Sequence, residues 1–301
     1  MAYKIEFVRE MEFTYGEAQQ VSPLIRRVVA DNPGPFTYKG TGVYIIGEGE
    51  VALIDPGPDT LEHLEALMRA VEGERLTHIF VTHFHLDHSP AARPLAALTG
   101  AKIYSSAVAP KREPDGAVEL EAGSDFNFAP DIVVHDGDRF SGPGWTIEAV
   151  TTPGHTSHHM AYALLEENAL FTGDHIMGWS TTVIGPPDGD MSAYLDSLIK
   201  VRDRDYDVLW PTHGPPIRRT RPFVQAYLDH RLDREAQVLG QLESGQHSIK
   251  DMVAEMYADV DRRLHPAARH SVLAHMIRLI RLGRVVCDGP PRVDSEYWLK
   301  R

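Results

Sequence analysis

The sequence predicts a mixed α/β fold in which helices cover layers of sheet, followed by a small winged-helix-like domain. Through residues 1–220, short apolar segments typical of strands alternate with segments in which apolar residues recur at helical spacing. From residue 221 to residue 301, helical patterns are followed by one short pair of strand-like segments. We therefore predict two domains, 1–220 and 221–301. The pattern alone leaves open whether the larger domain holds one doubly wound sheet or two packed sheets.

Strand and helix signals follow one another closely in the first domain. "VYII" (43–46) and "VALID" (51–55) flank "GEGE", which predicts a hairpin with a glycine-containing turn. A polar segment that contains Pro and Gly, 110–130, interrupts the pattern. Further strands are predicted at 78–82, 102–104, 132–138, 145–152, 160–165, 169–174 and 207–213, and helices at 60–71, after Pro90 and at 192–201.

The second domain begins with a long amphipathic helix, predicted over 221–246 from apolar residues at helical spacing. Ser248, followed by Asp251, predicts the N-cap of a second helix. Pro266 fits the first turn of a third helix. A turn at Asp288–Gly289 then predicts a closing hairpin. Three helices and a hairpin indicate a winged-helix-like domain, for which we expect a role in dimerisation or as a lid.

Composition limits the classes of function. The chain has 301 residues, of which 43% are hydrophobic and 24% charged, as in ordinary globular proteins. Its net charge of −13, which arises within residues 1–220, argues against a protein whose whole surface binds nucleic acid. Neither a signal-peptide core nor a membrane-spanning run is evident, so we expect a cytoplasmic protein without membrane contact. Cys287 is the sole cysteine, so any metal site must use nitrogen and oxygen ligands.

One short stretch, "VTHFHLDHSP" (81–90), concentrates metal-binding side chains directly after a predicted strand. In extended chain, His83 and His85 share a face because alternate residues point the same way. Asp87 and His88 lie on the turn beyond and can face a second point nearby. This spacing suits two neighbouring cations. The alternative is a solvated, histidine-rich turn.

Three further motifs repeat the arrangement and favour the metal site. "PGHT" presents His155, "TGD" presents Asp174, and "THG" presents His213, each at the end of a predicted strand with small residues around it. Loops on one edge of a rigid sheet converge in this way on binding sites. Four such segments with the right residue types indicate a shared site rather than four separate structural residues.

With these motifs, the chain resembles the metallo-β-lactamase-fold hydrolase superfamily, through "HFHLDH", "PGHT", "TGD" and "THG" in that order. Asp55 in "LIDPG" matches the first motif of that superfamily. The resemblance covers about the first 220 residues and implies an αβ/βα sandwich with a dinuclear metal site. The tail resembles the β-lactamase-like protein 2 branch, whose animal members are endoribonucleases.

The resemblance implies a complete ligand set for two Zn²⁺ ions, with iron or manganese as alternatives. Two such cations would lower the pKa of a bridging water toward about 7 and so supply hydroxide at neutral pH. Asp87 would also steer the proton of this nucleophile, and Asp55 would orient a ligand rather than bind metal. The implied residues are His83, His85 and His155 for the first metal, Asp87, His88 and His213 for the second, Asp174 as the bridge, and His159 as a catalytic residue lining the pocket.

Three substrate classes follow. We favour a small ester, thioester or lactone, with single-stranded RNA as the alternative and β-lactam hydrolysis as a side activity. Branch resemblance supports RNA, whereas the acidic charge opposes it, because phosphate contacts supply most of the affinity for nucleic acids. A DNA-binding regulator is disfavoured, because it would not need a dinuclear site. For Ser180, Thr181 and Thr182, a loop role is preferred over substrate contact, and a homodimer is one expected assembly.

Overall fold

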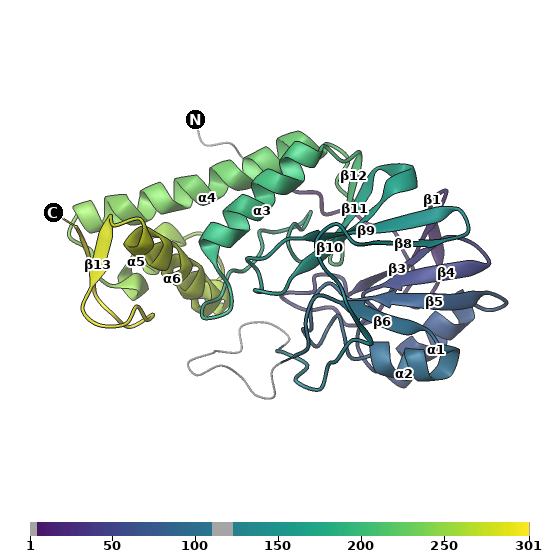
Figure 1. Cartoon of the computed structure of the whole chain (residues 1–301). Coiled ribbons are helices and arrows are strands. Elements are labelled where there is room, and N and C mark those ends of the chain that lie inside the picture. Colours follow the sequence, from purple (N-terminus) through teal and green to yellow (C-terminus); the bar gives the residue numbers. More distant parts are fainter. Residues whose placement is uncertain (1–4, 110–122, 301) are drawn as a thin grey trace.

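The computed structural model describes residues 5–109 and 123–300, and two packed sheets form its larger part (Figure 1). The first sheet has seven strands in the described residues, in sequential order from β1 to β7. Neighbours are antiparallel from β1 to β4 and parallel from β4 to β7. Its strands are β1 (Gln19–Ser22), β2 (Ile25–Val29), β3 (Gly42–Ile46), β4 (Glu50–Ile54), β5 (Arg75–Phe80), β6 (Lys102–Ser105) and β7 (Ile132–Val133).

The second sheet has five strands in the described residues, in the order β12-β11-β10-β9-β8. The pair β11–β12 is parallel, and the other neighbours are antiparallel. Its strands are β8 (Arg139–Gly142), β9 (Trp145–Thr151), β10 (Met160–Leu164), β11 (Ala169–Gly173) and β12 (Val208–Pro211), and a 3-10 turn, η1 (Leu165–Glu167), joins β10 to β11.

Helices cover the outer face of each sheet, which gives the four layers of an αβ/βα sandwich. On the first sheet lie α1 (Leu61–Ala70) and α2 (Ala92–Thr99), and on the second lie α3 (Met191–Arg204) and the first half of α4 (Thr220–Glu243) (Figure 1). A third apolar cluster fills the space between the sheets. The sandwich predicted from the resemblance is confirmed, and the doubly wound alternative is wrong.

Strand β3 shows how the sequence produces these layers. Val43 and Ile45 pack under the helices, while Tyr44 and Ile46 face the second sheet. Successive side chains of a strand point to opposite faces, so a strand buried on both faces is apolar throughout. The continuous run "VYII" is therefore what a middle strand of a sandwich requires.

The C-terminal part forms a separate apolar core. It contains α5 (Ile249–Met256), a 3-10 turn η2 (Arg262–Leu264), α6 (His265–Arg281), and the hairpin of β13 (Val285–Cys287) and β14 (Tyr297–Leu299). The second half of α4 packs into this core, while its first half packs on the two-sheet sandwich. The helices and hairpin of the predicted winged helix are thus present. The division at residue 220 stays a prediction, because α4 belongs to both cores.

Several local predictions need correction. Strands β1, β2 and β8 were not expected; β1 and β8 are short and contain no fully buried residue, whereas β2 is mostly buried. Ser248 precedes α5 as predicted, but its side chain does not cap the helix. Residues 288–296 form a long connection between β13 and β14 rather than a two-residue turn at Asp288–Gly289. The predicted polar segment lies partly outside the described residues, at 110–122.

None of the described helices combines the length and the apolar character needed to cross a membrane.

Candidate metal centre

The predicted site residues meet at one edge of the sandwich, because each follows the carboxyl end of a strand. Strands β4 and β5 are parallel, as are β11 and β12, and β9 runs in the direction of β11 because both are antiparallel to β10. Carboxyl ends of strands that run in one direction lie at the same edge of a sheet. The residues are Asp55 after β4, His83, His85, Asp87 and His88 after β5, His155 after β9, Asp174 after β11, and His213 after β12.

One group of three imidazoles gathers around a common point. His83 Nε2 lies 2.9 Å from His85 Nδ1, and His155 Nε2 lies 3.3 Å from the same atom. The three nitrogens form a cluster able to hold a metal ion. Zinc–nitrogen bonds of about 2.0–2.1 Å in a tetrahedron place the nitrogens about 3.3 Å apart. The observed separations therefore fit one divalent cation.

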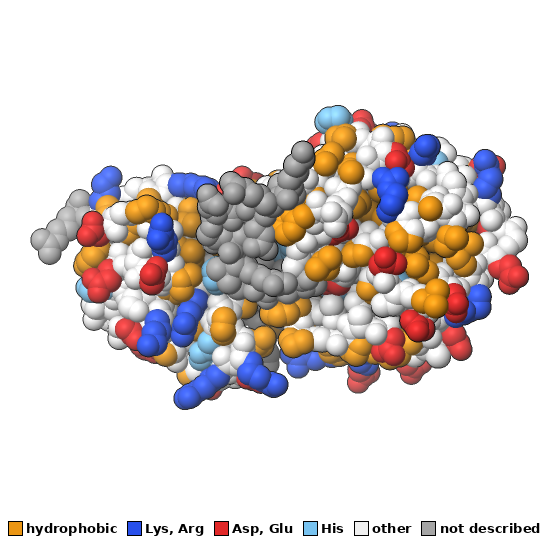
Figure 2. All heavy atoms as spheres, turned by 90° about the horizontal axis from the view of Figure 1, so that it is seen from below, with side chains coloured by type: hydrophobic (Ala, Val, Ile, Leu, Met, Phe, Trp, Pro, Cys, Tyr) orange, Lys and Arg blue, Asp and Glu red, His pale blue; other side chains and the backbone are white. Residues whose placement is uncertain are grey.

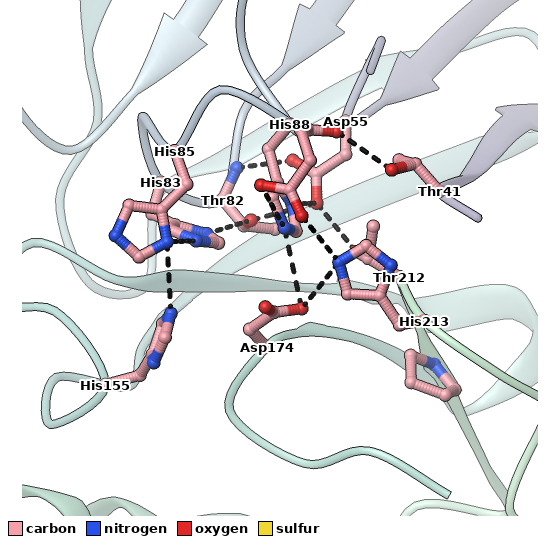
Figure 3. A network of polar contacts seen from close by, with 12 residues as sticks. Thr41, Asp55, Thr82, His83, His85, His88, His155, Asp174, Thr212 and His213 are labelled. Atoms are coloured by element: carbon pink, nitrogen blue, oxygen red, sulfur yellow. Dashed lines mark hydrogen bonds and ion pairs between the residues drawn. The ribbon is translucent and has the colours of Figure 1, made fainter. Parts of the chain in front are cut away.

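A second group of ligand atoms lies beside the first. His213 Nε2 is 3.0 Å from Asp87 Oδ2, and His88 Nε2 is 3.7 Å from Asp87 Oδ1. Asp174 Oδ1 lies 3.5 Å from both His88 Nε2 and His213 Nε2. These three atoms (His88 Nε2, His213 Nε2 and Asp174 Oδ1) are buried and make no hydrogen bond, so their partners are the ion-pair contacts just given, some of which are dashed in Figure 3. Buried polar atoms are rarely left without a hydrogen bond, and a second cation would satisfy all three.

Hydrogen bonds fix the tautomers of four of these histidines. Backbone carbonyls can only accept, so the carbonyl of Val183 holds a proton on His155 Nδ1 at 2.8 Å, and that of Gly40 holds one on His213 Nδ1 at 3.2 Å. The carboxylate of Asp55 does the same for His88 Nδ1 at 2.9 Å. In the neutral form of each ring the lone pair of Nε2 therefore points into the cluster, which is the form a metal ligand needs.

His83 is fixed through a hydroxyl relay. The hydroxyl of Thr82 donates its one proton to Asp55 Oδ2 at 2.9 Å, so toward His83 Nδ1, at 3.0 Å, it must accept. Asp55 also accepts from the backbone N–H of Thr82 and from the hydroxyl of Thr212, both at 2.8 Å. Four donors thus converge on a fully buried carboxylate (Figure 3). Asp55 lies behind the ligands, as predicted, and orients His83 and His88.

The electrostatics of the two groups differ. Burial holds the pKa of His83 well below its usual range and that of His85 at about 3, so these imidazoles are neutral. Burial also lowers the pKa of His88, but the carboxylates of Asp87 and Asp174 outweigh it and raise that pKa well above its usual range. The second group therefore attracts positive charge, which protons or a divalent cation can supply.

His159 lies behind the ligand groups. Its Nδ1 is bonded to the hydroxyl of Thr152 at 2.8 Å, and its Nε2 accepts from the backbone N–H of Asp174 at 3.2 Å. The ring is 1% exposed, and burial lowers its pKa well below the usual range. These contacts position Asp174, and the expected pocket-lining, catalytic role of His159 stays a prediction.

The segment 177–183 forms one wall of the site. The hydroxyl of Thr182 donates to the backbone carbonyl of Asp174 at 2.8 Å, and Val183 supplies the acceptor for His155. From the other side, α4 holds this segment, because Arg231 donates to the carbonyl of Thr182 at 2.5 Å and Tyr227 bonds the backbone of Met177. The loop role expected for Thr182 agrees with these contacts.

The sequence reasoning missed the residues that support the ligands. The hydroxyls of Thr82 and Thr212 both donate to Asp55, and each threonine directly precedes a predicted ligand, in "VTH" and "PTH". This repeated Thr-His pair was a usable signal. The carbonyls of Gly40 and Val183 could not be identified from the sequence, because every residue carries a carbonyl group.

Imidazoles and buried carboxylates converge at an edge between the two sheets and place the protein among those with a site able to hold metal ions. Residues 39–213 match the family model of the metallo-beta-lactamase superfamily, and residues 248–292 match that of the beta-lactamase associated winged helix domain. The chain therefore belongs to the metallo-beta-lactamase superfamily, and the predicted winged helix is confirmed.

Relatives extend over most of the chain. A beta-lactamase-like protein 2 homolog from Caenorhabditis elegans is 32% identical over 93% of this chain and 91% of its own length. An atrochrysone carboxyl ACP thioesterase from Aspergillus fumigatus is 34% identical over 74% of this chain and 66% of its own length. A metallo-beta-lactamase family protein from Thermus thermophilus has the same fold, with a TM-score of 0.76, 22% identity, and coverage of 93% of this chain and 100% of that chain.

Proposed function

We propose that the cluster holds two divalent cations, zinc in the first instance, with iron or manganese as alternatives. The observation that carries this proposal is the pair of adjacent ligand groups, one built on imidazoles and one on imidazoles with carboxylates. Such mixed nitrogen and oxygen ligands suit these metals. In this proposal His83, His85 and His155 hold the first ion, Asp87, His88 and His213 hold the second, and Asp174 contacts both.

The bound cations would supply Lewis acidity and lower the pKa of water. The protein contributes orientation and proton transfer. Asp87 Oδ2 faces His213 Nε2, which leaves Asp87 Oδ1 as the atom able to accept a proton from an attacking water. Asp55 fixes the rings of His83 and His88, and His159 fixes the backbone of Asp174. Each group is thus held in place before a substrate arrives.

For the substrate, we propose a small ester, thioester or lactone. The thioesterase named above, 34% identical to this chain, supports an acyl substrate. The net charge of −13 opposes single-stranded RNA, because a polyanion needs cationic contacts. On the face shown in Figure 2, Lys and Arg side chains lie in small groups, interspersed with acidic and apolar ones. RNA and β-lactams are therefore alternative outcomes of the test.

The test is a panel assay on zinc-loaded protein. The panel contains thioesters, lactones, a chromogenic cephalosporin and a fluorescent single-stranded RNA. We expect acyl turnover, with kcat/KM reduced by about 100-fold or more in Asp87→Asn because the proton acceptor is lost. Asp59→Asn, an exposed acid before α1, is the matched control and keeps wild-type activity. Metal analysis is expected to give two ions per chain.

Two results would overturn the proposal. RNA turnover that depends on Asp87, without turnover of any acyl substrate, would assign the protein to the nucleases. One firmly bound ion per chain in the active protein would reject the dinuclear site.

A further inference from the structure

A pocket lies on the other side of the wall segment from the metal centre. Its volume is about 230 Å³, and it is bounded by Pro35, Phe36, segment 177–183 and residues of α4 and α6. Thr182 and Val183 belong to this wall and also bond Asp174 and His155. The pocket and the metal centre are therefore separated by a single segment of chain.

The pocket contains a buried cation without a carboxylate partner. Arg231 is 3% exposed, and its Nε has no hydrogen-bond partner. Its guanidinium donates to the carbonyl of Thr182 and lies 5.1 Å from the centre of the Tyr194 ring. No carboxylate among residues 5–109 and 123–300 forms an ion pair with it, and no Asp or Glu of these residues lines the pocket. Buried charges are normally paired, so this arginine lacks its usual counter-ion.

A neutral donor in the same wall also favours an anion. The indole Nε1 of Trp179 is buried and has no hydrogen-bond partner. Arg234, one turn along α4 from His230, is a second cation of the pocket. Burial, followed by the charges of Arg231 and Arg234, lowers the pKa of His230 to about 3, so this imidazole is neutral.

Two arginines and an unpaired indole donor thus act in the same sense on one small pocket, and no Asp or Glu of the described residues lines it.

The remaining walls are apolar. Phe36, Met177, Val183, Tyr257 and Val260 line them, so a ligand would need an apolar body next to its anionic group. The volume is below the 300–1,000 Å³ or so of pockets that enclose a whole ligand, which suits one end of a substrate.

We propose that this pocket binds a carboxylate or phosphate group carried on an apolar segment, and that it selects acyl substrates with an anionic end. The proposal rests on acyl hydrolysis as the proposed function. Arg231 and Arg234 supply the charge, Trp179 supplies a neutral donor, and the apolar wall receives the adjoining carbons. A neutral substrate of the same shape gains only the apolar contacts.

The experiment measures binding and turnover separately. Binding of 4-phenylbutyrate, its neutral amide and phenyl phosphate to the zinc-loaded full-length protein is followed by calorimetry. The carboxylate or the phosphate is expected to bind, and the amide at least 10-fold more weakly. Arg231→Gln and Arg234→Gln should each weaken anion binding by about 10- to 100-fold, the loss of one charged hydrogen bond. Arg221→Gln, on an exposed part of the same helix, is the control and leaves binding unchanged.

Turnover is measured with matched thioesters whose acyl chain ends in a methyl or a carboxylate group. We expect both arginine variants to lower kcat/KM for the carboxylate substrate more than for the methyl substrate. Because Arg231 also holds the wall segment at Thr182, only Arg234→Gln is expected to leave turnover of the methyl substrate within twofold. If circular dichroism shows that Arg231→Gln is unfolded, the proposal is tested with Arg234→Gln and Trp179→Phe instead. Arg234 is only half-buried, and Phe keeps an aromatic ring while it removes the indole N–H.

The outcomes separate the two proposals. Anion binding that depends on the arginines, without acyl turnover, supports the pocket and rejects the proposed function. Acyl turnover with equal preference for both thioesters, or anion binding that persists in Arg231→Gln and Arg234→Gln, overturns the pocket.

Discussion

Asp55→Asn is the substitution that most directly tests how the metal ligands are held. Asp55 has φ 50°, a left-handed conformation that Asn also tolerates, so the backbone can stay as it is. Asn keeps the size of the side chain and replaces one carboxylate oxygen by an NH₂ group, which donates instead of accepting. We expect weaker binding of the second metal ion, because the proton on His88 Nδ1 is left with at best a neutral amide oxygen in place of the charged carboxylate.

The magnitude follows from the contacts of Asp55 Oδ2, which accepts from Thr82, Thr212 and His88 at 2.8–2.9 Å. The two hydroxyls can rotate and accept from an amide, whereas the imidazole N–H cannot. The ring must then lose a charge-assisted hydrogen bond of about 1.5–3 kcal/mol or move its proton to Nε2, where it blocks the metal. At about 1.4 kcal/mol per factor of ten, metal affinity falls by about 10- to 100-fold.

The assay is competition for zinc between the protein and a chromophoric chelator, with the number of ions per chain measured after dialysis. Asp59→Asn removes an exposed carboxylate four residues away and serves as the control, because its side chain lies outside the network. Circular dichroism of the metal-loaded proteins establishes that both variants are folded.

A folded Asp55→Asn protein that binds both ions within about twofold of the wild-type affinity would refute the reasoning. It would mean that His88 keeps its tautomer without the carboxylate. Equal losses in Asp55→Asn and Asp59→Asn would point instead to a general effect of net charge.

Three stability predictions test other parts of the structure by urea unfolding. Gly173→Ala should lower the free energy of unfolding by about 2–4 kcal/mol, because the new Cβ would lie 2.6 Å from His159 Nε2 at a φ of +52°; an unchanged value would contradict this packing. Gly240→Ala should raise the free energy of unfolding by about 0.5–1 kcal/mol, because Gly loses more conformational freedom than Ala in a helix and the new Cβ meets nothing within 4 Å. A decrease in this free energy would contradict the prediction. Glu235→Gln should lower the free energy of unfolding by about 2–4 kcal/mol at pH 7, because Arg278 loses a partner at 2.5 Å. Burial raises the pKa of Glu235, but the hydrogen bonds and charges of His275 and Arg278 outweigh this effect and hold the pKa below 4.5. The stability that Glu235 contributes is therefore present above pH 4.5 and is lost as the pH falls further. A difference in unfolding free energy between wild type and Glu235→Gln that does not shrink from pH 7 to pH 4 would contradict this reasoning.

The meeting of these side chains was predictable because the ends of strands and residues of ligand type coincide in the sequence. His155, Asp174 and His213 each follow an apolar run by a few residues, and small residues beside them allow a tight turn. The direction of the strands then brings these positions to one edge. Local patterns of this kind determine which residues meet, although not how their protons are arranged.

The proton arrangement depends on contacts that a sequence pattern does not show. His155 relies on the carbonyl of Val183, and His213 on that of Gly40, which is 173 residues away in the chain. His159 carried the same residue type as the ligands, yet its position behind Asp174 follows from the packing of β10 beside β11. The pocket is equally hidden, because Arg231 and Thr182 meet only when α4 packs on the sandwich.

Helix α4 explains why the second domain belongs to the site rather than being an appended module. Its first half packs into the core of the sandwich and its second half into the C-terminal core, without a break over 24 residues. Between these halves, Tyr227 and Arg231 bond the segment that carries the acceptor for His155. A continuous helix anchored in two cores joins them directly, while the lid or dimerisation role of the C-terminal domain stays a prediction. The C-terminal domain therefore completes the wall that separates the metal centre from the anion pocket, and it fixes both at once.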